Sequence, residues 1–93
     1  METVKVGVIG VGHLGQHHAR IYSELPQTHL VGVVDSDQER AAEIGQRFGV
    51  PHDAHWQKLL GQVDAVSVAV PTSKHREVVE ACLSAGVHFL VEK

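Results

Sequence analysis

VKVGVIGVGHLG, residues 4–15, is an apolar run that leads directly into the pattern Gly10-x-Gly12-x-x-Gly15. In a dinucleotide-binding turn the first glycine allows a tight bend, and the second lets a diphosphate approach the backbone. The third lets the following helix pack closely on the strand. We therefore predict that this loop binds the diphosphate of a nucleotide.

His13 and Leu14 fill the variable positions of this loop and begin the helix that follows. The first N–H groups of a helix lack intrahelical partners and carry partial positive charge, so they would hold the diphosphate without a lysine. His13 also clusters with His17 and His18, but the closest acidic residue in the sequence is the distant Glu24. We therefore predict no metal site and expect these histidines to pack and form hydrogen bonds.

A second apolar run, residues 29–34, ends in Asp35, which lies 20 residues beyond the last glycine of the motif. The fingerprint has an acidic residue at about this distance, where it binds the hydroxyls of the adenosine ribose and repels a 2′-phosphate. This favours NAD as the cofactor, with Asp35 and Ser36 beside the ribose, while Ser36 and the nearby Arg40 keep NADP as an alternative. Asp35 could instead be the N-cap of the next helix, a role that Asp37 would fill equally well.

The composition bounds the chain to one small domain. It has 93 residues, 43% hydrophobic but only 4% aromatic, so Val, Leu, Ile and Ala must fill the core, as in a parallel sheet covered on both faces. The net charge is −3 and no basic run occurs, which argues against a nucleic-acid partner. No signal segment, no membrane-spanning apolar run and a single Cys82 lead us to expect a cytoplasmic protein without membrane contact.

Apolar periodicity predicts that strands and helices alternate along the chain. We expect strands at residues 4–9, 30–34, 50–52, 65–70 and 88–91, and helices at 13–25, 38–48, 54–60 and 74–85. This order predicts an α/β fold of the Rossmann type, a doubly wound parallel sheet with strand order 3-2-1-4-5. The ligand would lie outside the carboxyl ends of strands one and four, where the glycine loop, Val70-Pro71-Thr72 and Glu92-Lys93 meet.

Helical spacing predicts the positions of two further groups of side chains. Val78, Val79, Cys82 and Leu83 form the expected buried stripe of the last helix, which makes Cys82 a core residue and not a nucleophile. Trp56 repeats at helical spacing with two leucines, so we expect it in the core or at its rim. Stacking of Trp56 on the cofactor is the less favoured alternative.

Three motifs together resemble one family. They are GVIGVGHLG at 7–15, AVPTSKH at 69–75 and AGVHFLVEK at 85–93. Over essentially its whole length the chain is similar to the N-terminal NAD(P)-binding portion of the glucose-fructose oxidoreductase / inositol dehydrogenase / MocA (Gfo/Idh/MocA) family. The resemblance implies hydride transfer between a nicotinamide cofactor and a hydroxyl of a sugar, a cyclitol or a nucleotide sugar. The first two motifs are most similar to dehydrogenases of nucleotide-linked amino sugars.

The resemblance also implies roles for residues towards the end of the chain. Lys93 would be the catalytic-site lysine that positions or polarises the reacting hydroxyl, and Glu92 would lie near the nicotinamide ribose. Pro71 and Thr72 would line the nicotinamide half of the cofactor, with His75 beside it. Without the resemblance, Glu92 and Lys93 would be interpreted as a solvated polar pair at the end of a strand.

The family has a C-terminal substrate domain that supplies further catalytic residues and forms the oligomer, and this domain is absent from the 93 residues. We therefore expect residues 1–93 to be a partial dinucleotide-binding domain that is inactive alone, and the full-length family member to be a homo-oligomer. A different hypothesis is a stand-alone regulatory module that binds nucleotide without catalysis. A third is a fragment whose bare last strand pairs with another copy.

Overall fold

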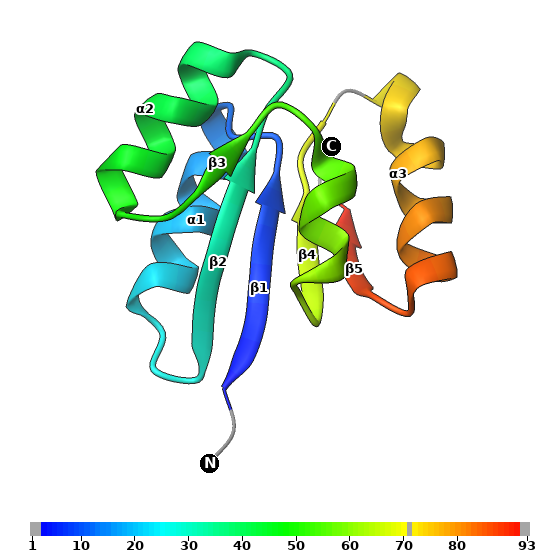
Figure 1. Cartoon of the computed structure of the whole chain (residues 1–93), viewed down its shortest axis with the longest axis horizontal. Helices are drawn as coiled ribbons and strands as arrows, with labels where there is room; N and C mark the ends of the chain where they lie inside the picture. Colours follow the sequence, from blue (N-terminus) through cyan, green and yellow to red (C-terminus); the bar gives the residue numbers. More distant parts are fainter. Residues whose placement is uncertain (1–2, 71, 92–93) are drawn as a thin grey trace.

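Within the computed structural model, which describes residues 3–70 and 72–91 but not the side chain of Thr72, the strands form one parallel sheet (Figure 1). Its order is β3-β2-β1-β4-β5, which confirms the predicted topology. Each connection between neighbouring parallel strands crosses over through a helical segment. The strands are β1 Val4–Ile9, β2 Thr28–Val34, β3 His52–Asp53, β4 Ala65–Val68 and β5 His88–Val91.

Helices cover both faces of the sheet, as a doubly wound fold requires (Figure 1). One face packs on α1 and α2, and the other packs on η1, a 3₁₀ helix, and α3. None of the described helices is long and apolar enough to cross a membrane. The helices are α1 His13–Glu24, α2 Gln38–Phe48, η1 Trp56–Gly61 and α3 Thr72–Ala85.

Each face of the sheet has its own apolar core. Val6 and Val8 of β1 belong to the cluster beneath α1 and α2, whereas Ile9 belongs to the cluster beneath η1 and α3. Successive side chains of a strand point to opposite faces, so one short apolar run supplies both cores. Because β1 is the central strand, the loop that follows it begins at the carboxyl edge of a sheet that is covered on both faces.

The start of α2 resolves the choice between Asp35 and Asp37 as N-cap. The side chain of Asp37 accepts hydrogen bonds from the backbone N–H groups of Glu39 and Arg40 at 3.1 and 3.2 Å. Asp37 therefore caps the helix, which ends at Gly49 in a left-handed conformation with φ +66°. Asp35 is left to make other contacts, which are described with the site below.

Some predicted boundaries were wrong. β4 ends at Val68 and not at residue 70, and its described register with β5 runs to the pair of Val68 and Val91. The helix expected at residues 54–60 is the later 3₁₀ helix η1, and α3 begins two residues earlier than expected. The predicted strand at 50–52 is observed as β3, which shares only His52 with the prediction, since His52 and Asp53 are the residues that pair with β2 at the sheet edge.

The predicted buried stripe of α3 was wrong at Leu83. Val78 and Cys82, one helical turn apart, are buried against the sheet, but the side chain of Leu83 is 66% exposed. A step of one residue rotates the side chain by about 100° around the helix, which turns Leu83 away from the sheet. At this end α3 packs beside β5, which is the edge strand among the described residues.

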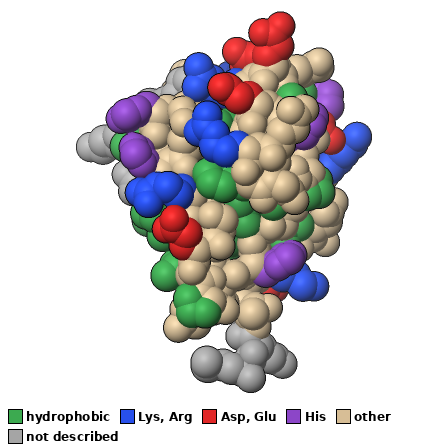
Figure 2. All heavy atoms as spheres, turned by 90° about the vertical axis from the view of Figure 1, so that its left-hand side faces the viewer, with side chains coloured by type: hydrophobic (Ala, Val, Ile, Leu, Met, Phe, Trp, Pro, Cys, Tyr) green, Lys and Arg blue, Asp and Glu red, His purple; other side chains and the backbone are tan. Residues whose placement is uncertain are grey.

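The surface formed by the left-hand side of Figure 1 carries both signs of charge (Figure 2). Basic and acidic side chains lie intermingled on this face, without a continuous basic patch. Arg20 pairs with Glu24 on α1 and Arg47 pairs with Glu43 on α2, both between residues four apart. Exposed pairs of this kind contribute little stability, so they indicate a solvated surface rather than a binding site.

Candidate nucleotide-binding site

The carboxyl ends of β1, β2 and β4 border a cavity of about 370 Å³. It lies at the switch point of the sheet order, where β1 has β2 on one side and β4 on the other. Open α/β sheets bind ligands in this position. The lining comes from the glycine loop, the ends of β2 and β4, the segment between β3 and η1, the start of η1, and α3: Ile9, Gly10, Gly12, Val34, Asp35, Ser36, Ala54, His55, Trp56, Gln57, Ala69, Val70, Lys74 and Val78.

Gly10 makes the tight bend at the end of β1. Its φ is +92°, and a Cβ added there would lie 2.5 Å from the carbonyl oxygen of Ala69. Its backbone N–H donates to the carbonyl of Val34 at 2.7 Å. The backbone conformation and the contact with the end of β4 therefore both exclude a side chain at this position.

Gly15 and Gly12 differ in what surrounds them. A Cβ on Gly15 would lie 1.8 Å from the carbonyl oxygen of Gly10, so α1 packs directly against the loop. A Cβ on Gly12 would have no described atom within 4 Å, and its φ of −68° suits any residue. Gly12 borders the cavity, so the empty space above it is room for a ligand that approaches the backbone.

The N-terminus of α1 has backbone N–H groups that can bind an anion. Gly12 is its N-cap, no side chain caps the helix, and no acidic residue lies in its first turn. The helix ladder starts with the N–H of Gln16, which donates to the carbonyl of Gly12 at 2.9 Å. In contrast, α2 has its first N–H groups bound by Asp37. The donors at the start of α1 and the open space at Gly12 together fit a diphosphate.

Asp35 is held in one orientation by two backbone donors. Its Oδ2 accepts from the N–H of Val11 in the glycine loop at 2.9 Å, and its Oδ1 accepts from the N–H of Asp37 at 2.9 Å. A carboxylate oxygen has a further lone pair, so Asp35 can still accept hydrogen bonds from ribose hydroxyls. The spacing in the sequence indicated the acidic residue, but nothing in it indicated the bond to Val11.

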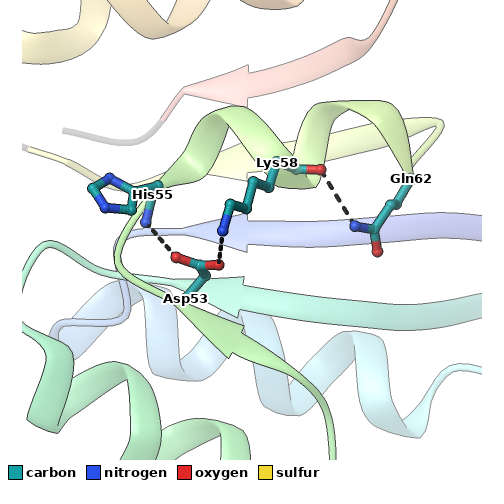
Figure 3. A network of polar contacts seen from close by, with 4 residues as sticks. All are labelled: Asp53, His55, Lys58 and Gln62. Carbon is teal, nitrogen blue, oxygen red and sulfur yellow. Dashed lines mark hydrogen bonds and ion pairs between the residues drawn. The ribbon is translucent and has the colours of Figure 1, made fainter.

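A short network fixes the wall of the cavity that runs from the end of β3 to the start of η1 (Figure 3). Asp53 accepts from the backbone N–H of His55 at 2.9 Å and pairs with Lys58 Nζ at 3.6 Å. The hydrogen bond from His55 is the main cause that lowers the pKa of Asp53, and the charge of Lys58 adds to it. Gln62, the residue directly after η1, donates to the carbonyl of Lys58 at 3.4 Å.

This wall carries residues that the sequence prediction did not assign to the site. Trp56 is half-buried, packs against the core beneath η1 and α3, and also lines the cavity. Its predicted position at the rim of the core is therefore confirmed. His55 lines the cavity as an exposed residue, although no spacing in the sequence distinguished it from the other histidines. Lys74 is the single Lys or Arg among the described lining residues.

The other predicted site residues lie in different places. His13 and Leu14 are exposed on the first turn of α1 and do not line the cavity. Val70 lines the cavity, and its carbonyl lies 2.7 Å from Nε2 of His75, which ties the start of α3 to the end of β4. The remaining ones, namely Pro71, the side chain of Thr72, Glu92 and Lys93, lie outside the described residues.

The histidines of α1 contact other aromatic side chains. The rings of His13 and His17 meet edge to face with centroids 5.1 Å apart, and His18 meets Tyr22 in the same way at 6.4 Å. Tyr22 in turn shares a 2.6 Å hydrogen bond with the buried hydroxyl of Ser67 in β4. Within residues 3–70 and 72–91, no group of three His, Cys, Asp or Glu side chains is placed to hold a metal ion.

Comparison with known proteins also indicates a nucleotide-binding Rossmann fold. The family described as oxidoreductases with an NAD-binding Rossmann fold (GFO_IDH_MocA) matches residues 4–93. UDP-N-acetylglucosamine 3-dehydrogenase from Acidithiobacillus ferrooxidans is 47% identical over 90 residues, which are 97% of this chain and 28% of that protein. Inositol 2-dehydrogenase 1 from Saccharopolyspora erythraea is 38% identical, over 98% of this chain and 28% of its own length.

Solved structures of such proteins share the fold closely. The structure of the Acidithiobacillus ferrooxidans enzyme superposes with a TM-score of 0.92 at 45% identity, covering 100% of this chain and 30% of that one. GenD2 from gentamicin A biosynthesis, solved in complex with NAD, gives a TM-score of 0.94 at 32% identity and covers 100% of this chain and 27% of its own. The chain thus spans less than a third of the length of these relatives.

Proposed function

The chain belongs to the Gfo/Idh/MocA oxidoreductases, as part of their NAD-binding Rossmann fold, and on this premise we propose that it is the cofactor-binding part of a dehydrogenase that oxidises a hydroxyl of a sugar, a cyclitol or a nucleotide sugar. The observation that carries this proposal is the cavity at the switch point. There the uncapped start of α1, the open space at Gly12 and the oriented carboxylate of Asp35 lie together.

Each part of the cavity suits one part of the dinucleotide. The diphosphate binds at Gly12 and the first N–H groups of α1, and the hydroxyls of the adenosine ribose bind Asp35 and Ser36. A 2′-phosphate would lie against the charge of Asp35, so we expect NAD to bind more tightly than NADP. Bound NAD supplies the hydride acceptor for the carbon that carries the reacting hydroxyl.

We assign the nicotinamide end by family resemblance. In this proposal Pro71, Thr72 and His75 border the nicotinamide half, and Glu92 lies beside its ribose. Lys93 positions the substrate hydroxyl and stabilises negative charge that develops on its oxygen as the proton leaves. The assignment of His75 to this region is supported by its contact with Val70, because Nε2 of His75 lies 2.7 Å from the carbonyl oxygen of this cavity-lining residue.

The substrate class is proposed from the relatives. The most informative is the UDP-N-acetylglucosamine 3-dehydrogenase, at 47% identity over 97% of this chain. A nucleotide-linked amino sugar is therefore our preferred substrate, with inositols next because inositol dehydrogenases are also similar. The Rossmann part alone fixes neither, since specificity depends on the surface that holds the substrate against the nicotinamide.

We further propose that residues 1–93 bind NAD without turnover. Hydride transfer needs a substrate held against the nicotinamide together with a proton acceptor, and such positioning accounts for a large part of the barrier reduction. The 93 residues correspond to 28% of the length of the relative from Acidithiobacillus ferrooxidans. We assign substrate binding and assembly into a homo-oligomer to a further domain of the full-length protein. NADH formed by the purified chain from NAD and UDP-N-acetylglucosamine would refute the proposed inactivity.

Nucleotide binding itself is tested by thermal unfolding with and without NAD. A ligand that binds only the folded chain raises its unfolding free energy, by about 2.7 kcal/mol at 100 times Kd. We expect Asp35→Ala to lose most of this stabilisation because the ribose loses its acceptor. Asp37→Ala is the matched control, since it removes the cap of α2 and lowers stability without touching the cavity lining. An unchanged midpoint of the parent chain at millimolar NAD would contradict the proposal.

A further inference from the structure

We propose that two copies of this chain associate through the outer edge of β5, so that their two sheets join into one. The association concerns residues 1–93 themselves and does not depend on the nucleotide binding proposed above. β5 lies at the end of the sheet that is away from α2 (Figure 1), and among the described residues it pairs only with β4. Its outer side is therefore open to another strand.

The two edges of the sheet differ in how well they are protected. β3 has only two residues, His52 and Asp53, follows Pro51, and carries a charge that pairs with Lys58. Short length, proline and charge are the features that keep an edge strand from pairing with another chain. β5 has no proline, lysine, arginine or acidic residue, and it pairs with β4 over its full length, His88–Val91, in unbroken register. β5 therefore lacks the protection that β3 has.

Apolar side chains flank this edge on both faces of the sheet. Phe89 lies beside Val66, which belongs to the core beneath η1 and α3. Leu90 lies beside Ser67, whose hydroxyl shares a hydrogen bond with Tyr22 of α1, so Leu90 points to the opposite face. Phe89 is 36% exposed and Leu90 is 52% exposed. A strand that is apolar on both faces is typical of the inside of a parallel sheet and not of its edge.

The outer flank of α3 extends this surface. Lys74 lines the nucleotide cavity together with the start of η1, and Ala81 packs against the core beneath η1 and α3, so these two residues mark the flank towards η1. A rotation of about 100° per residue places Val79 and Leu83 on the opposite flank, towards the outer side of β5. Among the described large hydrophobic side chains, Leu83 is the most exposed and Leu90 is the second. The β5 edge surface, as we call it, consists of Val79, Leu83, Phe89 and Leu90.

The backbone of β5 has groups that can bind a second strand. The N–H of His88 donates to the carbonyl of Asp64 at 3.1 Å, so the backbone groups of His88 face β4. In a parallel strand every second residue directs its N–H and C=O to the same side, so those of Phe89 and Val91 point to the outer edge. Backbone groups in this position form a template for pairing with another chain.

A second copy of the chain fits this surface through two-fold symmetry. When the two β5 strands run antiparallel around an axis through the sheet at Leu90, this residue lies opposite Leu90 of the second copy. Phe89 then lies opposite Val91 of the second copy, and the two residues exchange their outward N–H and C=O groups. The same axis brings the outer flank of α3 beside its copy, which covers Val79 and Leu83. One self-complementary surface thus supplies both halves of the interface.

The mass of the chain at a series of concentrations tests this association. Sedimentation equilibrium should give a mass that rises from one chain to two and no higher, because a two-fold contact closes on itself. Leu90→Lys should weaken the dimer by about 10-fold or more, since two like charges would face each other at the axis. Leu83→Lys should act in the same direction, and it leaves the core intact because this side chain is exposed.

Ile21→Lys is the matched control. Ile21 is also an exposed hydrophobic residue, but it belongs to α1, which packs mainly on β1 and β2 and lies away from the outer edge of β5. This variant should dimerise as the parent does. Circular dichroism and the thermal midpoint, measured at a concentration where the parent is monomeric, show whether each variant is folded.

A cross-link tests the register of the two strands. Residues opposite each other in a non-hydrogen-bonded antiparallel pair have Cα atoms about 4.5 Å apart, which a disulfide can span. Leu90→Cys should therefore form a covalent dimer on oxidation with diamide, whereas the native Cys82 is buried and should not react. Ile21→Cys should form no covalent dimer under the same conditions.

Three results would overturn the inference. A mass of one chain at every concentration up to the millimolar range would show that β5 does not bind a second copy. A dimer that Leu90→Lys and Leu83→Lys leave unchanged, or that Ile21→Lys abolishes, would place the interface on another surface. Absence of a cross-link in a dimeric sample of Leu90→Cys would show that the two strands do not pair around Leu90.

Discussion

Gly12 and Gly15 belong to the same motif, yet they are glycines for different reasons. At Gly15 the neighbour is the protein itself, because a Cβ added there would lie 1.8 Å from the carbonyl oxygen of Gly10. At Gly12 the space is open, and its backbone angles suit any residue. The glycine at 15 is therefore required by folding, and we propose that the glycine at 12 is required by the ligand.

This difference predicts opposite phenotypes for two identical substitutions. Gly12→Ala should leave the unfolding free energy within about 1 kcal/mol of the parent, because it only changes an N-cap, but should weaken NAD binding by about 10-fold or more. Gly15→Ala should cost about 3 kcal/mol or more of stability, because α1 must move away from the loop. Chemical denaturation and calorimetry measure the two effects. Normal NAD affinity in Gly12→Ala would show that the diphosphate does not approach this position.

At the scale of elements, local patterns predicted most of the fold. The apolar run from Val4 to Ile9 predicted a strand, and Val6, Val8 and Ile9 do lie in the two cores. Helical spacing and the cap at Asp37 predicted α2, and a glycine with positive φ ends it. These signals are local in sequence and predicted the elements, whereas the sheet order followed from the rule for right-handed crossovers and the pattern of the Rossmann fold.

The parts that the sequence did not predict depend on contacts between distant segments. Helical spacing made Trp56 a core or rim residue, but the same spacing does not tell that Trp56 also lines a cavity. The cavity forms between segments that are distant in sequence, such as the ends of β2 and β3, where the N–H of Asp35 donates to the carbonyl of Asp53. The prediction that Leu83 is buried was wrong for a related reason, since the exposure of this side chain depends on which elements flank α3.

The turn between β3 and η1 gives a prediction for acid stability. The pKa of Asp53 lies below its ordinary value of 3.8, first because of the N–H of His55 and then because of Lys58. A lowered pKa in the folded state means that this group stabilises the fold above its unfolded pKa, and that the contribution disappears as the pH falls through the folded pKa. Asp53→Asn should therefore be less stable than the parent near neutral pH, and the difference should shrink in acid.

Denaturation at a series of pH values measures this difference. Lys58→Gln is the control, because it removes the neighbouring charge but keeps the hydrogen bond from His55, so most of the pH dependence should persist. A stability difference between Asp53→Asn and the parent that stays constant down to strong acid would mean that Asp53 is not held by these partners. The thermal midpoints of the parent, Asp53→Asn and Lys58→Gln, measured without nucleotide at neutral pH, should rank the three proteins in the same order of stability.

At the scale of the whole molecule, the two apolar cores lie on opposite faces of one sheet, and the nucleotide site lies at its carboxyl edge. At this edge the glycine loop is joined to the end of β2, because the N–H of Val11 donates to the carboxylate of Asp35. Val78 belongs to the core beneath α3 and also lines the cavity. A bound nucleotide should therefore stabilise α3 as well as the loop.

Cys82 allows this coupling to be measured. It is the single cysteine, its side chain is fully buried between α3 and the sheet, and burial raises the pKa of its thiol. Alkylation therefore requires α3 to open, and its rate reports the population of the open form when reclosing is fast. If opening destroys the nucleotide site, NAD must slow the reaction by the factor 1 + [NAD]/Kd, about 100-fold at 100 times Kd.

The Gly12→Ala variant separates this coupling from direct protection of the thiol. It keeps the core around Cys82, so its alkylation without nucleotide should match that of the parent, but NAD should slow it far less at the same concentration. Alkylation of the parent chain at the same rate with and without saturating NAD would have the opposite meaning. It would show that α3 opens while the nucleotide stays bound, so that the cavity and the core beneath α3 are not one cooperative unit.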